Sequence, residues 1–183
     1  MTQERLKLRS IVEAGIFIAI AFVLGRLELR IMPQGGSINI VAVPLVIYAV
    51  RNGFGRGVLA GAVCGVLVLT WTGVVYHPLS GLLDYVLPPA AMGLAGLFRG
   101  KWGAYKGILL GCGVGLAAHV LSGVLIFGHF MPDNFMGIPM ENVFFYAFLY
   151  NAAHIVPSLV VSLLILALLS KPLKRFILRQ DGR

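Results

Sequence analysis

One segment of the chain, residues 77–93, combines residues that could bind a ligand with residues that distort a helix. Its sequence, HPLSGLLDYVLPPAAMG, holds one carboxylate, Asp84, among Leu, Val, Ala, Pro and Gly. An ionisable side chain at membrane depth costs ~2.5–3.5 kcal/mol or more, and such residues are functional candidates by default. Tyr85 adds a ring and a hydroxyl, and Pro88 and Pro89 interrupt helical hydrogen bonding close by. This combination predicts a binding site for a flat cation.

Three further polar residues are expected at membrane depth, where packing alone does not require them: His119, Tyr146 and Asn151. Each also has an ordinary structural explanation. Tyr146 could belong to an interfacial aromatic belt, Asn151 could join two helices, and His119 could bond a backbone carbonyl. Tyr146 and Asn151 are separated by about 140° around a helix, so both can face a wide cavity but not a narrow seam.

The elements that must position these residues are membrane-spanning helices. The chain has 183 residues, of which 58% are hydrophobic and 12% charged, and its mean hydropathy is +0.90. Soluble domains contain about 25% charged residues, so this composition indicates an integral membrane protein. The length allows roughly six spans of ~20 residues in one bundle, with no room for a separate soluble domain.

The sequence therefore predicts an all-α membrane protein with one domain, residues 1–183, and six transmembrane helices. The predicted helices cover residues 10–29, 38–50, 58–75, 79–98, 106–127 and 142–169. Of the 15 Lys and Arg residues, only Arg26 and Arg30 fall in segments predicted to be external. Basic residues concentrate in cytoplasmic loops, so both termini are expected in the cytoplasm. Glu13 is explained here by the favourable interaction of a carboxylate with a helix N-terminus.

Several functions are disfavoured by what the sequence lacks. It contains no His-Glu-x-x-His, no Gly-x-Ser-x-Gly, no paired carboxylates on one helix, no acidic metal cluster and no phosphate-binding loop for ATP. No catalytic residues, metal or cofactor are therefore expected. The net charge of +8 is placed at segment ends and not along one face, which argues against nucleic acid as a partner. Cys64 and Cys112 lie in apolar runs and are interpreted as small core residues.

The connection 128–141, GHFMPDNFMGIPME, is rich in Phe and Met and contains no Lys or Arg. It is expected on the external side. Its apolar character leaves two interpretations open. The segment could be a lid over a site, or it could rest on the bilayer surface.

Over nearly its whole length, the chain resembles the thiamine-specific S-components, the substrate-binding membrane subunits of energy-coupling factor (ECF) vitamin transporters. The motifs that carry the resemblance are MPQGGS at 32–37, HPLSGLLDY at 77–85, GLAGLFR at 93–99, AHVLSGVLIFG at 118–128, and YxxxxN at 146–151 followed by Val-Pro-Ser at 156–158. The resemblance implies a six-helix bundle in the bacterial cell membrane that binds thiamine near its external side. It also implies partnership with a transmembrane coupling protein and two ATPase subunits, which alone use ATP.

The resemblance also implies roles for individual residues. The substrate-binding positions it assigns are Asp84, Tyr85, His119, Tyr146, Asn151, Phe127 and Asn39. Relatives can carry Glu at the position of Asp84, an acidic residue at that of Asn39, and tryptophans at those of Gly35 and Phe127. Gly15 and Ala19, four residues apart on one face of the first helix, match the surface that contacts the coupling protein.

The chemistry of thiamine agrees with these assignments. A desolvated carboxylate suits its thiazolium cation or its amino group, and Asn, His and Tyr suit the edge of its pyrimidine. The alternatives are an S-component or solitary transporter for a related vitamin or precursor, such as hydroxymethylpyrimidine or riboflavin, or an intramembrane enzyme. A neutral or anionic ligand would have little use for Asp84, and the missing catalytic pairs argue against an enzyme.

Overall fold

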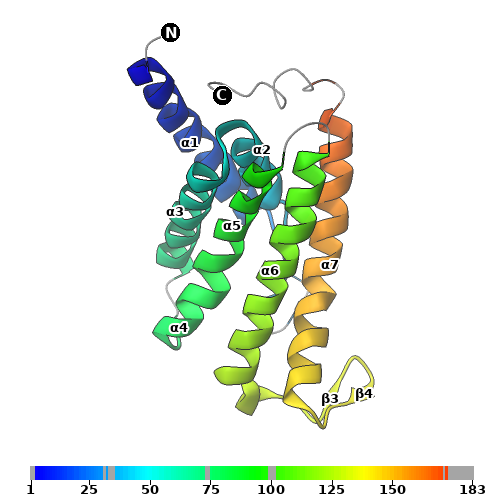
Figure 1. The fold of residues 1–183 in the computed structure, drawn as a ribbon. Helices are drawn as coiled ribbons and strands as arrows, with labels where there is room; N and C mark the ends of the chain where they lie inside the picture. The colour runs from blue at the N-terminus through cyan, green and yellow to red at the C-terminus, as the bar shows by residue number, and fades with distance from the viewer. Residues whose placement is uncertain are drawn as a thin grey trace.

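Helices make up most of the computed structural model, which describes residues 3–30, 32, 36–72, 75–98, 102–170 and 172 (Figure 1). The helical elements are α1 (Gln3–Arg26), α2 (Ala42–Asn52), α3 (Phe54–Thr72), α4 (Pro78–Ser80), the π-helical η1 (Gly81–Val86), α5 (Leu87–Ala91), the 3₁₀-helical η2 (Met92–Leu97), α6 (Gly103–Leu125), the 3₁₀-helical η3 (Gly128–Phe130) and α7 (Val143–Ser170). Two antiparallel pairs of short strands join β1 (Leu29–Arg30) to β2 (Ser37–Ile38) and β3 (Asn134–Phe135) to β4 (Ile138–Pro139).

Four of the described helices, α1, α3, α6 and α7, are long and apolar enough to cross a membrane. Helix α2 has 11 residues and is about 16 Å long, roughly half of the ~30 Å hydrocarbon core. The segment predicted as one helix over residues 79–98 is helical from Pro78 to Leu97, but it changes helix type three times. The protein is therefore an all-helical membrane protein in which two of the predicted spans are irregular or short.

The first helix begins at Gln3, earlier than the predicted start at residue 10, and this changes the explanation for Glu13. Glu13 lies well inside α1, so the interpretation that a helix N-terminus stabilises it is wrong. Its carboxylate instead accepts hydrogen bonds from Arg51 at 2.7 and 3.2 Å and from Asn52 at 3.2 Å. The Arg51 side chain is only 1% exposed, so removing Glu13 would take a close counter-charge from a buried cation. This ion pair fastens α1 to the end of α2.

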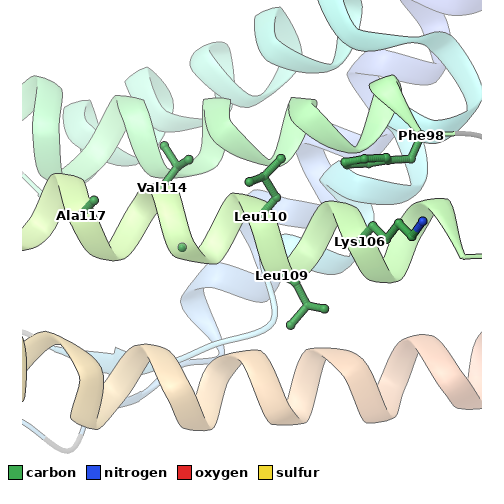
Figure 2. A pocket seen from close by; sticks show the side chains of 7 residues that line it. Phe98, Lys106, Leu109, Leu110, Val114 and Ala117 are labelled. Carbon is green, nitrogen blue, oxygen red and sulfur yellow. The ribbon is translucent and has the colours of Figure 1, made fainter.

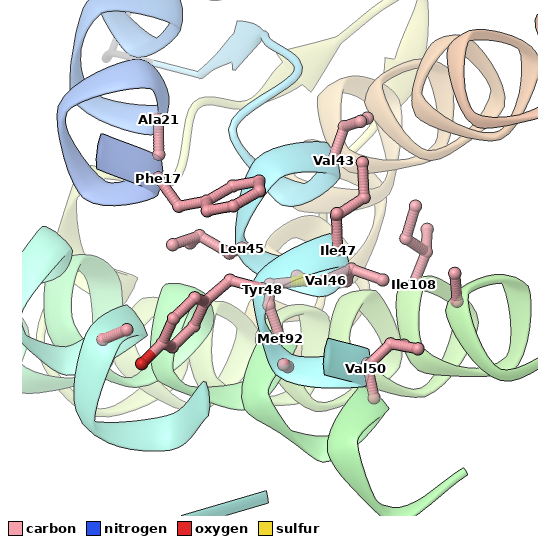
Figure 3. Close-up of a cluster of buried hydrophobic side chains, with 14 of the residues drawn as sticks. Phe17, Ala21, Val43, Leu45, Val46, Ile47, Tyr48, Val50, Met92 and Ile108 are labelled. Atoms are coloured by element: carbon pink, nitrogen blue, oxygen red, sulfur yellow. The ribbon is translucent and has the colours of Figure 1, made fainter. Parts of the chain in front are cut away.

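The hydrophobic core is built around α2, in which every residue from Val43 to Arg51 is buried. Phe17 of α1, Met92 of η2 and Ile108 of α6 belong to the same cluster (Figure 3). The helix ends at Asn52 and is followed by Gly53, whose φ of 90° is readily adopted only by glycine. Helix α2 is therefore a central helix enclosed by its neighbours.

Two rows of glycines hold the segment 78–97 between α3 and α6. The rows are Gly57, Gly61 and Gly65 on α3 and Gly107 and Gly111 on α6. A Cβ added at Gly61 would collide with the carbonyl of Pro89, and a Cβ added at Gly107 would collide with Ala95. Small residues at such spacing let membrane helices approach closely. The glycines thus fix the position of the segment that carries Asp84.

The start of α1 and the end of α7 lie at the same end of the bundle, and β3 and β4 lie at the opposite end (Figure 1). Part of the charge pattern behind the predicted orientation lies outside the described residues. The basic residues concerned are Arg99, Lys101, Lys171, Lys174, Arg175, Arg179 and Arg183.

Candidate ligand-binding site

Asp84 lies in a π-helical turn, η1, which covers Gly81–Val86. Pro88 and Pro89 follow after Leu87, and neither has an N–H to donate to the carbonyl four residues earlier. The regular α-helical pattern therefore cannot continue through this part of the segment. In a π-helical turn the hydrogen bonds reach five residues back, and such turns are frequent at functional sites. Tyr85 lies beside Asp84 in this turn and is half-buried.

Helix α6 holds the Asp84 carboxylate from the other side. His119 Nδ1 lies 3.0 Å from Asp84 Oδ1, and the Ser122 hydroxyl donates to Asp84 Oδ2 at 2.7 Å. His119 and Ser122 are three residues apart, so they project from the same face of the helix. Ser122 is fully buried, whereas the side chains of Asp84 and His119 are each 20% exposed. The carboxylate is thus fixed in position and still accessible.

Helix α7 extends this polar group. The rings of His119 and His154 lie 6.1 Å apart between centroids, and His154 Nε2 lies 3.3 Å from Asn151 Oδ1. The Asn151 amide donates to the carbonyl of Ala147 at 2.8 Å. A continuous chain of polar side chains therefore connects η1, α6 and α7. Its members, called the polar chain below, are Ser122, Asp84, His119, His154 and Asn151.

Tyr146 belongs to a cluster of aromatic rings beside the polar chain. The rings of Tyr146, Tyr150 and Phe135 lie 5.5–5.7 Å apart between centroids. The Tyr150 ring also lies 6.3 Å from that of His154. Phe135 is buried and comes from β3, so the 128–141 connection packs against α7 next to the polar chain. This contact favours the interpretation of that connection as a cover.

The hairpin formed by β1 and β2 packs against α7 on another side of His154. A Cβ at Gly36 would lie 2.6 Å from the His154 ring, so the backbone approaches this ring as closely as glycine allows. Ser37 donates to Glu28 at 2.6 Å, and Arg30 donates to the same carboxylate at 2.8 Å. Burial raises the pKa of Glu28, but these hydrogen bonds outweigh it, and the pKa lies below its ordinary value of 4.5. Glu28 therefore stays ionised and ties the hairpin together.

Two residues that the resemblance assigns to the site lie in other surroundings. The Asn39 side chain accepts a hydrogen bond from the Val41 N–H at 3.3 Å, just before α2, and the backbone N–H of Asn39 donates to the Ser158 hydroxyl of α7 at 3.2 Å. Phe127 follows the end of α6, and its ring lies 5.9 Å from that of Tyr76. The structure thus brings Asp84, His119, Tyr146 and Asn151 into one group and places Asn39 and Phe127 in contacts of their own.

Ser122 and His154 are the members of the polar chain that the sequence alone did not single out. Ser122 follows His119 by three residues, and His154 follows Asn151 by three residues. That helical spacing was the available signal, because residues three apart share a face. Serine and histidine near other polar residues are too common for this spacing to identify them unaided.

The polar chain is neither a metal site nor part of the large groove along α6, among the residues that the structure describes. Within the described ranges, no group of three or more His, Cys, Asp or Glu could hold a metal ion. A groove of about 590 Å³ runs along α6, but Leu109, Leu110 and Val114 line it, and no member of the polar chain does (Figure 2). Its apolar surface suits hydrocarbon and not a cation.

Comparison with known proteins identifies the family. The sequence matches the sequence model of the thiamine transporter protein family over residues 11–178. It is 31% identical to the thiamine transporter ThiT of Bacillus subtilis (strain 168), over 92% of this chain and 93% of that protein. It is 24% identical to ThiT of Lacticaseibacillus paracasei, over 99% and 96% of the two chains.

The fold leads to the same group of proteins. The structure matches a solved structure of ThiT from Listeria monocytogenes with a TM-score of 0.80 and 22% identity, covering 93% of this chain and 98% of the other. The family match extends over most of the sequence and includes every residue of the polar chain. The chain therefore belongs to the thiamine transporter protein family.

Proposed function

We propose that this chain is the thiamine-binding S-component of an ECF importer. Membership of a family of transporters supports a transport role and not an enzymatic one. In this proposal the chain forms one domain that crosses the bacterial cell membrane six times, with both termini in the cytoplasm. It captures thiamine on the external side, needs no cofactor, and docks with a coupling protein and two ATPase subunits.

The observation that carries the proposal is the accessible carboxylate of Asp84 within the polar chain. Thiamine has a permanently cationic thiazolium ring and an aminopyrimidine ring. Asp84 suits the cation or the amino group, and His119 and Asn151 can exchange hydrogen bonds with the pyrimidine edge. The rings of Tyr146 and Tyr150 add faces for stacking, and a cation over such a face gains about 0.5–2 kcal/mol.

The other assigned residues have supporting roles in this proposal. Tyr85 follows Asp84 directly and contributes a wall of the site from η1. Phe127 forms an aromatic wall with Tyr76 at the end of α6. Asn39 acts indirectly, because its backbone N–H binds Ser158, whose hydroxyl also donates to the carbonyl of His154 at 2.8 Å.

Calorimetry of the purified protein with thiamine, hydroxymethylpyrimidine and riboflavin tests the proposal. Thiamine is expected to bind most tightly, because it alone combines a cationic ring with an aminopyrimidine. Binding of hydroxymethylpyrimidine with equal affinity would instead show that the site recognises only the pyrimidine. Failure of all three ligands to bind would contradict the proposal.

The substitution Asp84→Asn tests the central residue. Losing a desolvated charged contact typically costs about 2–5 kcal/mol, so thiamine affinity should fall at least about 30-fold. The fold should survive, because neutralising a carboxylate at membrane depth removes a cost of desolvation. Glu4→Gln is the matched control, since it neutralises an exposed carboxylate at the start of α1 and outside the polar chain. Unchanged thiamine affinity in Asp84→Asn would exclude Asp84 as the main ligand.

The outer face of α1 supports the proposed docking with the coupling protein. Gly15 and Ala19 are both exposed, and a Cβ added at Gly15 would meet no atom within 4 Å. Phe17 and Ala21, in contrast, are buried against the core. This small-residue face therefore makes no demand on the fold of the chain itself and is open to another helix.

A further inference from the structure

A second groove, of about 380 Å³, lies between α1 and α3, which pack side by side (Figure 1). On α1 it is lined by Lys7, Ile11, Ala14 and Ile18, whose spacing of four, three and four residues places them on one helical face. From Lys7 to Ile18 this face is about 16 Å long, roughly half of the ~30 Å hydrocarbon core. The groove therefore has the depth of one membrane leaflet.

Helix α3 forms the opposite wall with the same arrangement of charge and apolar surface. Its lining residues are Arg56, Leu59, Ala60 and Val63. Arg56 lies near the start of α3, as Lys7 lies near the start of α1, and both helices start at the same end of the bundle (Figure 1). One basic side chain thus stands at the same end of each wall.

Two hydroxyl groups close the floor of the groove, and they form hydrogen bonds within the protein. Ser10 and Tyr48 are 5% and 2% exposed, and their hydroxyl oxygens lie 3.3 Å apart. The Tyr48 hydroxyl also donates to the Ser10 carbonyl at 3.2 Å. The hydroxyl groups of the floor therefore leave Lys7 and Arg56 available to bind a ligand. Lys7 and Arg56 are exposed and form no ion pair with another residue in the part of the chain that the structure describes.

We propose that this groove binds an anionic phospholipid, with its phosphate at Lys7 and Arg56 and an acyl chain between the apolar walls. Ile11 and Leu59 are 68% and 66% exposed, so hydrocarbon must cover them in the bilayer. A lipid without net charge would also serve that purpose, but it would bring no net negative charge to balance the two cations. Basic pockets between membrane helices on the cytoplasmic side are typical sites for anionic headgroups. Gly15 and Ala19 do not line the groove, so it is distinct from the proposed docking face.

Native mass spectrometry of the purified full-length protein tests this site. The protein is titrated with phosphatidylglycerol and with phosphatidylcholine that carries identical acyl chains. We expect tighter binding of phosphatidylglycerol. Lys7→Gln and Arg56→Gln should each weaken that binding about fivefold, which corresponds to ~1 kcal/mol per basic side chain near an anionic lipid. They should weaken phosphatidylcholine binding less, because the choline cation of that lipid already neutralises its phosphate.

Arg5→Gln is the matched control, because Arg5 is exposed at the same end of α1 but about 200° around the helix from Lys7. It should not change the binding of either lipid. Ala14→Leu, which fills the groove, should weaken both lipids. Equal binding of the two lipids by the unmodified protein, or an equal loss in Arg5→Gln, would overturn the proposal. The proposal would also be wrong if Lys7→Gln and Arg56→Gln lost a coupling protein that co-purifies with the unmodified chain while their lipid binding did not change. The groove would then bind a protein and not a lipid.

Discussion

At the level of single residues, the hydroxyl of Ser122 sets the position of the Asp84 carboxylate. It is fully buried and donates to Oδ2 at 2.7 Å, while His119 occupies the other oxygen. A carboxylate held by two partners is already oriented before a ligand arrives. Such pre-organisation raises affinity because less ordering remains to be done on binding.

Ser122→Ala should therefore weaken thiamine binding although the residue is not expected to touch the ligand. A hydrogen bond to a charged group contributes about 1.5–3 kcal/mol, so we expect a loss of affinity of roughly tenfold or more. Calorimetry measures the affinity, and thermal unfolding measures the stability. Ser162→Ala is the control, since Ser162 is equally buried on α7 but is not a member of the polar chain. If both variants lose the same affinity, Ser122 is only a packing residue.

Site residues could be predicted from the sequence only where their residue type is rare within a membrane. Asp84, His119 and Asn151 could be proposed from the sequence because their desolvation needs a compensating role. Ser122 could not, because a small hydroxyl can bond its own helix and is tolerated anywhere in a span. The partner of Glu13 was also hidden, because Arg51 lies 38 residues away and is brought close only by the packing of α1 on α2.

At the level of elements, the glycine rows on α3 and α6 decide where the Asp84 segment lies. Gly61 faces the Pro89 carbonyl so closely that even one methyl group has no room. At Gly113 on α6, by contrast, an added Cβ would meet no atom within 4 Å. These two glycines therefore differ in packing although both lie inside long helices.

Gly61→Ala should lower stability and weaken thiamine binding, because α3 must move away from the segment 78–97. Overpacking of this kind costs about 1–3 kcal/mol. Gly113→Ala should leave both properties near those of the unmodified protein or raise stability slightly, since alanine favours helix over glycine by up to about 1 kcal/mol in water. Thermal unfolding in detergent and calorimetry check both variants. Equal stability of the two would show that the glycines do not set the helix spacing.

The type of helix distortion near Asp84 could not be predicted from the sequence. Two consecutive prolines indicate that α-helical hydrogen bonds are lost, but the backbone can then form a kink, a break or a wider turn. Close packing between two glycine rows keeps the segment nearly continuous here, which leaves the wider turn as the response. The short length of α2 was easier to anticipate, because its apolar run is brief and Gly53 follows it.

At the level of the whole molecule, ligand binding and energy coupling should be separable. The polar chain is formed by η1, α6 and α7, whereas Gly15 and Ala19 lie on the outer face of α1. Composition alone was enough to predict a helical membrane protein. It could not show which helical faces meet, because lipid-facing and buried faces are equally apolar in such a bundle.

Replacing both Gly15 and Ala19 with Leu should leave thiamine binding to the isolated protein near its original affinity. Thiamine uptake by cells that carry the complete transporter should collapse, because the larger side chains block the approach of a coupling helix. Gly113→Leu is the control, since it adds one leucine side chain at an open position on α6. Uptake at the original rate in the α1 variant would place the docking surface elsewhere.

The π-helical turn at Asp84 also makes this part of the chain sensitive to the deletion of a single residue. Such a turn holds one residue more than an α-helical turn, and the last residues of η1, Tyr85 and Val86, already pack against Gly65 of α3. Deleting one codon between Asp84 and Pro88 would remove the extra residue of this turn, while Pro88 and Pro89 would still lack N–H donors. It would also change the direction of Asp84 relative to the residues that pack between the glycine rows, away from His119 and Ser122. A single-codon deletion would therefore disrupt the proposed binding site while the surrounding bundle keeps its packing.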